Sequence, residues 1–126
     1  MDLAFQIIGL NRMTISKRTV MVCDDEKDLL RIFQIKLSSK YKVVVADSGK
    51  LCIEKFIELR QKGIKVDVLL LDYRLGDVLG DYVACEVHKL NGVNTILISA
   101  YVIDEKLIKE LTEKGCIVEI FRNPSI

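Results

Sequence analysis

The sequence predicts an α/β domain built around a doubly wound, parallel sheet of five strands. Three observations predict this fold. Five short apolar runs, each too brief for a helix, alternate along the chain with four longer segments whose apolar residues have helical spacing. The third run, residues 66–72, is rich in Val and Leu, which is typical of a strand buried on both faces. Strict alternation of strands and helices predicts parallel strands joined by right-handed crossovers.

The elements follow in order from these patterns. The apolar runs predict strands over residues 19–23, 41–46, 66–72, 95–99 and 116–121. The helical spacing predicts helices over residues 26–39, 48–62, 81–92 and 104–115. Ser48 is expected to cap its helix, Asp81 and Asp104 to open theirs, and Gly63 to end one in a left-handed conformation. In the second helix, the residues expected to face the core are Cys52, Ile53, Phe56, Ile57 and Leu59.

The composition is that of one ordinary globular domain. The chain has 126 residues, of which 50% are apolar and 29% charged, so it can bury its own core. The formal charge is only +1 and no long block of Lys and Arg occurs, which argues against direct nucleic-acid binding. No apolar run is long enough to span a bilayer, so we expect no membrane association. Four cysteines without CxxC spacing predict buried thiols in a reducing cytoplasm.

Acidic residues stand at the ends of two predicted strands. The first strand ends on Asp24 and Asp25, and the third ends on Asp72. In a flavodoxin-like sheet of order 2-1-3-4-5 these strands are neighbours at the point where the winding reverses, so the three carboxylates would converge. Clustered carboxylates repel one another unless a cation intervenes, and Mg²⁺ is usually held by such oxygens. An aspartate beside that metal can attack a phosphoryl group and form an aspartyl phosphate.

Each of these residues also has a simpler interpretation. Asp72 could merely start a turn, and Asp24 and Asp25 could be a helix cap and a first-turn acid. Ser99, at the end of the fourth strand, could donate a hydrogen bond to a phosphoryl oxygen or could tie down its own turn. The cap hypothesis does not explain why an acid also ends the third strand.

The chain resembles the receiver domain of two-component response regulators, of the single-domain chemotaxis type, over residues 19–124. Four motifs, at the ends of four predicted strands, carry the resemblance. They are Val22-Cys23-Asp24-Asp25-Glu26, Leu69-Leu70-Leu71-Asp72-Tyr73-Arg74-Leu75 with Gly80, Ile96-Leu97-Ile98-Ser99-Ala100, and Phe121-Arg122-Asn123-Pro124. Each motif alone is weak, but four in this order make a specific signal.

The resemblance implies a function and a metal. Asp72 would accept a phosphoryl group from a phosphohistidine of a sensor histidine kinase or phosphotransfer protein, and a conformational change would be read by a downstream protein target. Asp25 and Asp72 would bind Mg²⁺ directly, Asp24 would do so through water, and the backbone carbonyl of Arg74 would complete the protein ligands. The protein would be a phosphoryl acceptor that assists its own phosphorylation and dephosphorylation, not an enzyme acting on a separate substrate.

The resemblance also implies roles around the phosphoryl site. Ser99 would swing toward the phosphoryl oxygens, while Arg74 and Tyr101 flank the site and set how fast water removes the group. The sequence departs from the family at two of its positions. Asn123 replaces the lysine that pairs with the phosphoryl group, and Ile120 replaces the switch aromatic. Arg122 could take over from the lysine only if the strand contained a bulge, because neighbouring strand residues point to opposite faces.

These departures leave other function classes open. One alternative is an atypical receiver-like interaction module that does not depend on phosphorylation. An aspartate-nucleophile phosphatase is disfavoured, because Asp72-Tyr73-Arg74 lacks a second acid two residues on. The sequence contains no glycine-rich phosphate loop, so nothing in it indicates a nucleotide cofactor. His88, the only histidine, is expected on the surface of a helix or half-buried.

Residues 1–17 are predicted to be an N-terminal extension and 18–126 the receiver domain. No residues remain up to Ile126 for the family's fifth helix, which would leave an apolar face of the sheet uncovered. Asp2 could cap a short helix that covers this face in its own subunit or in a homodimer partner, and the alternative is that this segment is disordered. The apolar side of that helix would carry Leu3, Phe5, Ile7 and Ile8.

Overall fold

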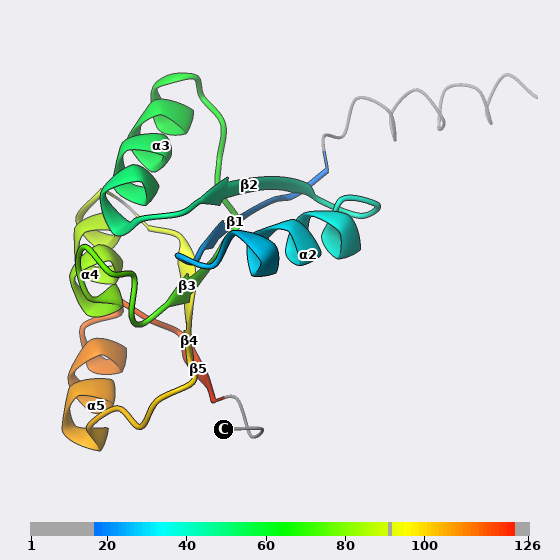
Figure 1. Ribbon diagram of the computed structural model, residues 1–126. Coiled ribbons are helices and arrows are strands. Elements are labelled where there is room, and N and C mark those ends of the chain that lie inside the picture. The colour runs from blue at the N-terminus through cyan, green and yellow to red at the C-terminus, as the bar shows by residue number, and fades with distance from the viewer. Residues whose placement is uncertain (1–16, 91, 123–126) are drawn as a thin grey trace, which may run out of the picture.

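Five parallel strands alternate with four helices in the computed structural model, which describes residues 17–90 and 92–122 (Figure 1). The sheet has the order β2-β1-β3-β4-β5, and all four strand pairs are parallel. The strands are β1 (Thr19–Cys23), β2 (Lys42–Ala46), β3 (Val68–Asp72), β4 (Asn94–Ser99) and β5 (Glu119–Arg122). The helices are α2 (Lys27–Leu37), α3 (Gly49–Gln61), α4 (Gly80–Lys89) and α5 (Glu105–Glu113). The predicted fold class and strand order are confirmed.

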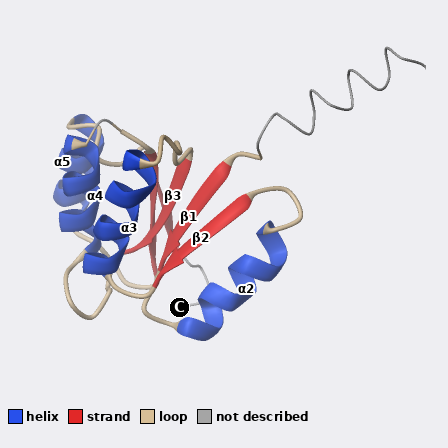
Figure 2. Cartoon of the chain, turned by 90° about the horizontal axis from the view of Figure 1, so that it is seen from above, coloured by secondary structure: helices blue, strands red, loops and turns tan. Residues whose placement is uncertain are grey.

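The helices divide unequally between the two faces of the sheet. Figure 2 shows α3, α4 and α5 together on one face and α2 alone on the other. Alternate residues of each strand face opposite sides, so Leu69 and Leu71 enter the larger core under α3–α5. Leu70, between them, faces the smaller core under α2. The described helices therefore cover one face of the sheet fully and the other in part.

Local signals in the sequence set several helix ends as predicted. The Ser48 hydroxyl accepts a hydrogen bond from the Leu51 amide at 3.1 Å, as a helix cap does. Asp104 accepts from the Lys106 amide at 3.0 Å at the start of α5. Gly63, after α3, has φ +74°, a conformation that suits glycine best.

Other predicted details are wrong. Ile57 was expected in the core but is 38% exposed, because α3 buries only the narrow stripe that contains Cys52 and Phe56. Asp81 does not open α4, which begins one residue earlier at Gly80. The predicted helix over residues 26–39 is shorter at both ends, as α2 covers Lys27–Leu37.

The fifth strand also begins later than its apolar pattern predicts. Cys116 and Ile117 are buried, but their backbone amides both donate to the Leu111 carbonyl at the end of α5. They therefore belong to the turn that follows α5 and not to the sheet. From Glu119 to Arg122 the pairing with β4 runs residue for residue, so these residues contain no bulge.

Some predictions lie outside the described residues. They concern residues 1–16, Asn91 at the predicted end of a helix, and residues 123–126 with Asn123. All four cysteines are described and are free thiols, three of them buried and Cys85 half-buried, as predicted. None of the described helices is long and apolar enough to pass through a membrane.

Candidate functional site

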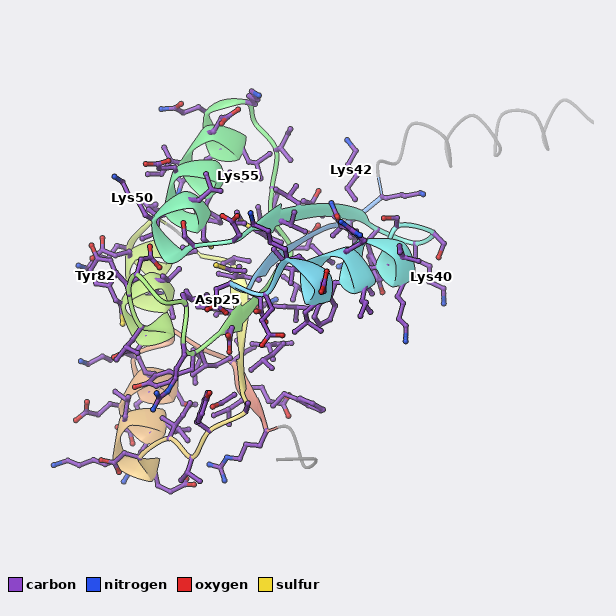
Figure 3. All side chains as sticks on the ribbon, in the orientation of Figure 1. Asp25, Lys40, Lys42, Lys50, Lys55 and Tyr82 are labelled. Carbon is purple, nitrogen blue, oxygen red and sulfur yellow. The ribbon has the colours of Figure 1, made fainter. Side chains whose placement is uncertain are left out.

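Three carboxylates meet at the carboxyl edge of the sheet. Asp24 and Asp25 directly follow β1, and Asp72 is the last residue of β3, the strand beside it. One oxygen from each of the three lies within 4.8 Å of the others, and in the described residues this is the one such group of possible metal ligands. Figure 3 labels Asp25, which lies beside the start of α2. The strand order thus brings together residues that are 47 or more positions apart in the chain.

Asp24 is held by the turn that leads into α2. Its side chain is buried, and Oδ1 accepts a hydrogen bond from the Glu26 amide at 2.9 Å. The residue that caps α2 is Glu26, which makes no side-chain cap bond. The alternative in which Asp24 and Asp25 serve as the helix cap and a first-turn acid is therefore wrong, since both precede the cap.

Burial and mutual repulsion make this cluster unfavourable when fully charged. Burial, followed by the charges of Asp24 and Asp25, raises the pKa of Asp72 to about 7, although the Arg74 and Tyr73 backbone amides partly oppose the shift. The pKa of Asp24 is also raised, chiefly by burial and also by Asp25. A divalent cation would remove this repulsion, and three hard carboxylate oxygens fit Mg²⁺. The donor set therefore suits the metal that the sequence predicts.

The cluster opens into a pocket of about 610 Å³. Arg74 is the one basic side chain that lines this pocket among the described residues. Its guanidinium lies 4.2 Å from the centre of the Tyr101 ring, a cation–π contact at the rim. Leu29 of α2 and Ile98 of β4 form the apolar part of the wall. The pocket is thus acidic at its base, basic at its rim and apolar on one side.

Ser99 is buried at the end of β4 and does not line the pocket. Its hydroxyl donates to the Tyr101 carbonyl at 2.6 Å and accepts from the Tyr101 amide at 2.9 Å. In this structure the hydroxyl ties down its own turn, the simpler of the two sequence interpretations. A hydrogen bond from Ser99 to a phosphoryl oxygen would require this turn to open.

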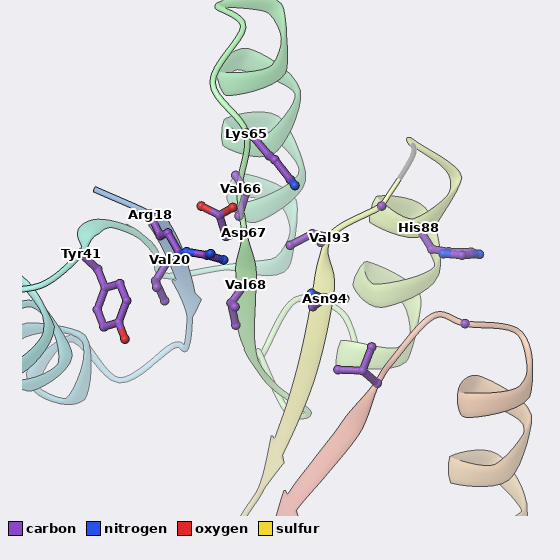
Figure 4. Close-up of a pocket in the computed structure, with 13 residues that line it drawn as sticks. Arg18, Val20, Tyr41, Lys65, Val66, Asp67, Val68, His88, Val93 and Asn94 are labelled. Atoms are coloured by element: carbon purple, nitrogen blue, oxygen red, sulfur yellow. The ribbon is translucent and has the colours of Figure 1, made fainter. Parts of the chain in front are cut away.

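A second pocket, of about 410 Å³, lies at the opposite edge, where the strands begin (Figure 4). Its carboxylate, Asp67, already accepts a hydrogen bond from the Thr19 amide at 2.8 Å. His88 lines this pocket from α4 and is exposed, which agrees with the sequence analysis. Arg18 and Lys65 also line the pocket, so no group of acids converges there.

No protein-family model matches the sequence, and no curated protein is similar to it. Solved structures of the same fold do match. A CheY-like response regulator receiver domain protein from Methanospirillum hungatei JF-1 has a TM-score of 0.73 at 19% identity, covering 86% of this chain and 83% of that one. A response regulator receiver domain protein from Clostridium thermocellum has a TM-score of 0.71 at 22% identity, covering 85% and 82%. The response regulator TrrA from Thermotoga maritima, in complex with Mg²⁺ and BeF, has a TM-score of 0.67 at 22% identity, covering 84% and 86%.

The chain has the fold of a response regulator receiver domain. Two further residues that the sequence analysis considered for the site, Ile120 and Arg122, are described but do not line the acidic pocket. Ile120 packs against the larger core. Arg122 pairs with Glu105 at the start of α5. Asn123 lies outside the described residues.

Asp77, which the sequence analysis did not single out, and Gly80, which belongs to the Asp72 motif, support the β3–α4 loop. Asp77 accepts hydrogen bonds from the Gly49 and Lys50 amides, both at 2.9 Å, and so caps α3 from another part of the chain. Gly80 donates from its amide to the Tyr73 carbonyl, and a Cβ at Gly80 would lie 2.6 Å from the Asp72 carbonyl oxygen. No local pattern indicates the contacts of Asp77, because its partners are 27 and 28 residues away.

Proposed function

We propose that the chain is a response regulator receiver module that accepts a phosphoryl group on Asp72. The observation that carries this proposal is the convergence of Asp24, Asp25 and Asp72 at the switch point of a receiver fold. Clustered carboxylates are costly to keep at a partly buried site unless they bind a cation. The donor would be a phosphohistidine of a sensor histidine kinase or phosphotransfer protein, and the reader a downstream protein.

The chain's own residues would hold and orient the reacting groups. Asp25 and Asp72 would bind Mg²⁺ directly, with Asp24 through water and the Arg74 backbone carbonyl as a further ligand. The bound metal would supply positive charge that neutralises the transferring group. An oxygen of Asp72 would form a bond to phosphorus as the bond between phosphorus and the donor imidazole breaks. The receiver therefore assists its own modification and is not an enzyme with a separate substrate.

The turn at the end of β4 is the part that would respond. A phosphoryl group adds a charge of about −1.5 to −2 and strong acceptor oxygens. The Ser99 hydroxyl would exchange its bonds within the turn for one phosphoryl oxygen, and Tyr101 would move with it. Arg74 and Tyr101, stacked at the rim, would limit the entry of water. This change of surface is what a cytoplasmic protein partner would read, with residues 18–126 as the receiver domain.

A phosphorylation assay tests this proposal directly. The protein is incubated with Mg²⁺ and phosphoramidate, and its intact mass is measured over time. We expect one phosphoryl adduct on the wild type, none on Asp72→Asn and none after chelation of Mg²⁺. Asp28→Asn is the matched control, because Asp28 is an exposed acid in the first turn of α2. Mg²⁺ binding without any adduct would refute the proposal and would favour an interaction module that does not depend on phosphorylation.

A further inference from the structure

Part of one sheet face has no helix over it in the described residues. On the α2 side of β3, β4 and β5 four apolar residues form a strip, since Leu70 pairs with Ile96 and Ile98 pairs with Phe121 across the strands. Two acids on the same side border the strip, Glu119 paired with Ile96 and Asp72 paired with Ile98. Leu70 and the two isoleucines are half-buried, and Phe121 is 60% exposed. In Figure 2 the single helix on this side, α2, lies beside β2. Phe121 is thus the side chain of this strip that is most open to water.

Helix α2 forms a wall along this strip. Its Leu30 and Phe33 face the smaller core, and its Arg31 and Gln34 line a pocket with residues of β2 and α3. The opposite flank of the helix carries Leu29 and Ile32, by the spacing of three and four residues that shares a face. Leu29 lines the acidic pocket together with Ile98, and Ile32 is 47% exposed. We define the apolar groove by its floor and its wall, which are Leu70, Ile96, Ile98, Phe121, Leu29 and Ile32.

We infer that residues 2–10 of the same chain dock in this apolar groove as a short helix. The sequence supports an apolar helical segment, because Leu3, Ile7 and Leu10 share one face at helical spacing and Phe5 and Ile8 add apolar surface beside it. A helix of this length would extend about 13 Å, somewhat less than the length of the five- and six-residue strands beneath it. The occupant therefore matches the groove in length and in apolar character.

The length and direction of the chain also permit this docking. Residues 11–16 can extend to about 20 Å, and they join Lys17 at the start of β1. The strip over β3–β5 lies about 5–15 Å from β1 across the sheet, and a helix axis lies about 10 Å above it, so the segment can reach. A helix that ends near the start of β1 runs antiparallel to the strands, as crossover helices do in this fold.

The same chain is favoured over a second copy as the source of the segment. A short tether gives an effective concentration in the millimolar range, whereas a second copy must reach such concentrations in solution. Docking would remove Ile98 and Phe121 from water, which is the usual driving force for covering an exposed apolar face. Neither argument uses the phosphoryl chemistry, so this inference stands or falls separately from the proposed function.

Photo-crosslinking in the full chain tests the contact. We replace Phe121 with the photoreactive p-benzoylphenylalanine, irradiate the protein, and map the products by mass spectrometry. We expect a cross-link within one chain from position 121 to residues 3–10. The control carries the same group at Ile35, which is 72% exposed on the outer side of α2, and should give no cross-link to this segment.

Two outcomes would overturn the inference. A covalent dimer would show that a second copy occupies the groove, and a monomer with no link to residues 3–10 would show that the segment lies elsewhere. A substitution supplies a second test. Ile7→Glu should increase the fluorescence of a hydrophobic dye bound to the protein several-fold and lower the melting temperature by about 5 °C. Ile35→Glu, the same change at a residue that is 72% exposed on α2, should change neither, and equal behaviour of the two variants would contradict docking.

Discussion

At the scale of single residues, the site depends on Asp72 being both partly buried and surrounded by like charge. Burial, followed by the charges of Asp24 and Asp25, raises its pKa to about 7 from an ordinary value of 3.8. Without a cation, the side chain would therefore be protonated in a substantial fraction of molecules at neutral pH. A protonated Asp72 is a poor nucleophile, so the proposed metal site and the proposed phosphoryl-accepting role are linked through one ionisation.

This pKa predicts how the stability of the metal-free protein depends on pH. Folded Asp72 holds its proton more tightly than in the unfolded chain, so its contribution to stability is largest at low pH. That contribution is lost as the pH rises from about 4 to about 7. We expect the free energy of unfolding, compared with that of Asp72→Asn, to fall by on the order of 1–2 kcal/mol between about pH 5 and about pH 8. The expected change in free energy is smaller than the full pKa shift implies, because water screens the half-exposed side chain.

Urea unfolding of both proteins at the two pH values measures this effect. The pH dependence of stability should be seen when a chelator keeps the protein free of metal. Saturating Mg²⁺ should raise the stability of the wild type at the higher pH, where the carboxylates are ionised. If the wild type and Asp72→Asn had parallel pH profiles in chelator, the carboxyl group of Asp72 would not titrate as the structure indicates.

A second prediction at this scale concerns the contact between Arg74 and Tyr101. Arg74→Ala removes the guanidinium from over the ring and opens the rim of the pocket to water. An exposed cation–π pair contributes about 0.5–1 kcal/mol, so we expect the phosphoryl group to be lost about two- to fivefold faster. The decay of the phosphorylated mass measures this rate. Arg31→Ala, an exposed arginine on α2, is the control, and equal rates for the two variants would exclude a shielding role.

At the scale of elements, the acidic cluster depends on how closely α4 approaches β3. Gly80 begins α4, and its amide lies 2.6 Å from the Tyr73 carbonyl oxygen. Any side chain there would meet the backbone of Asp72 and Tyr73. The absence of a Cβ thus lets the helix begin directly beside the strand end that carries Asp72.

Gly80→Ala should therefore both destabilise the protein and weaken metal binding. The added methyl group forces the backbone of Asp72 to shift, and such overpacking costs about 1–3 kcal/mol. Urea unfolding measures the stability, and titration with Mg²⁺ measures the affinity. Lys89→Ala, in the exposed last turn of the same helix, should change stability by no more than about 0.5 kcal/mol. A stable Gly80→Ala protein with unchanged Mg²⁺ affinity would contradict this account of the loop.

At the scale of the whole molecule, the two faces of the sheet contribute unequally to stability. The core under α3–α5 contains most of the fully buried side chains, among them Phe56, which is 3% exposed. The core under α2 is smaller, and its Phe33 is only partly buried. Stability therefore depends mainly on the face covered by three helices.

Matched truncations on the two faces test this inequality. Phe56→Ala should lower the free energy of unfolding by about 3–5 kcal/mol, because a large cavity is left in a closed core. Phe33→Ala should cost about 1–2 kcal/mol, since that side chain keeps part of its surface in water. Urea unfolding with a common slope gives both values. Equal losses would mean that the α2 face carries more of the stability than its burial indicates.

How much could be predicted from the sequence depends on the range of the interaction. Alternating apolar runs and helical spacing predicted the order of elements, and parallel strands with short crossovers then allow very few arrangements. The strand order in turn predicted that acids at the ends of two strands would meet. The predictions that failed, such as Ile57 in the core and Cys116 in a strand, treated an apolar residue as evidence of a specific element. An apolar residue such as Cys116 can be buried in a turn as well as in a strand. An apolar residue such as Ile57 can lie at the exposed edge of a helix's apolar face as well as at its centre.

The sequence by itself determined the sheet and the convergence of Asp24, Asp25 and Asp72, because burial periodicity and the shared carboxyl edge of parallel strands are local or topological properties. Only the tertiary structure decided that the Ser99 hydroxyl is bonded to its own turn and that Asp77 caps a helix 28 residues away. These contacts depend on how loops pack in three dimensions, and periodic patterns in the sequence do not predict which loops lie close together.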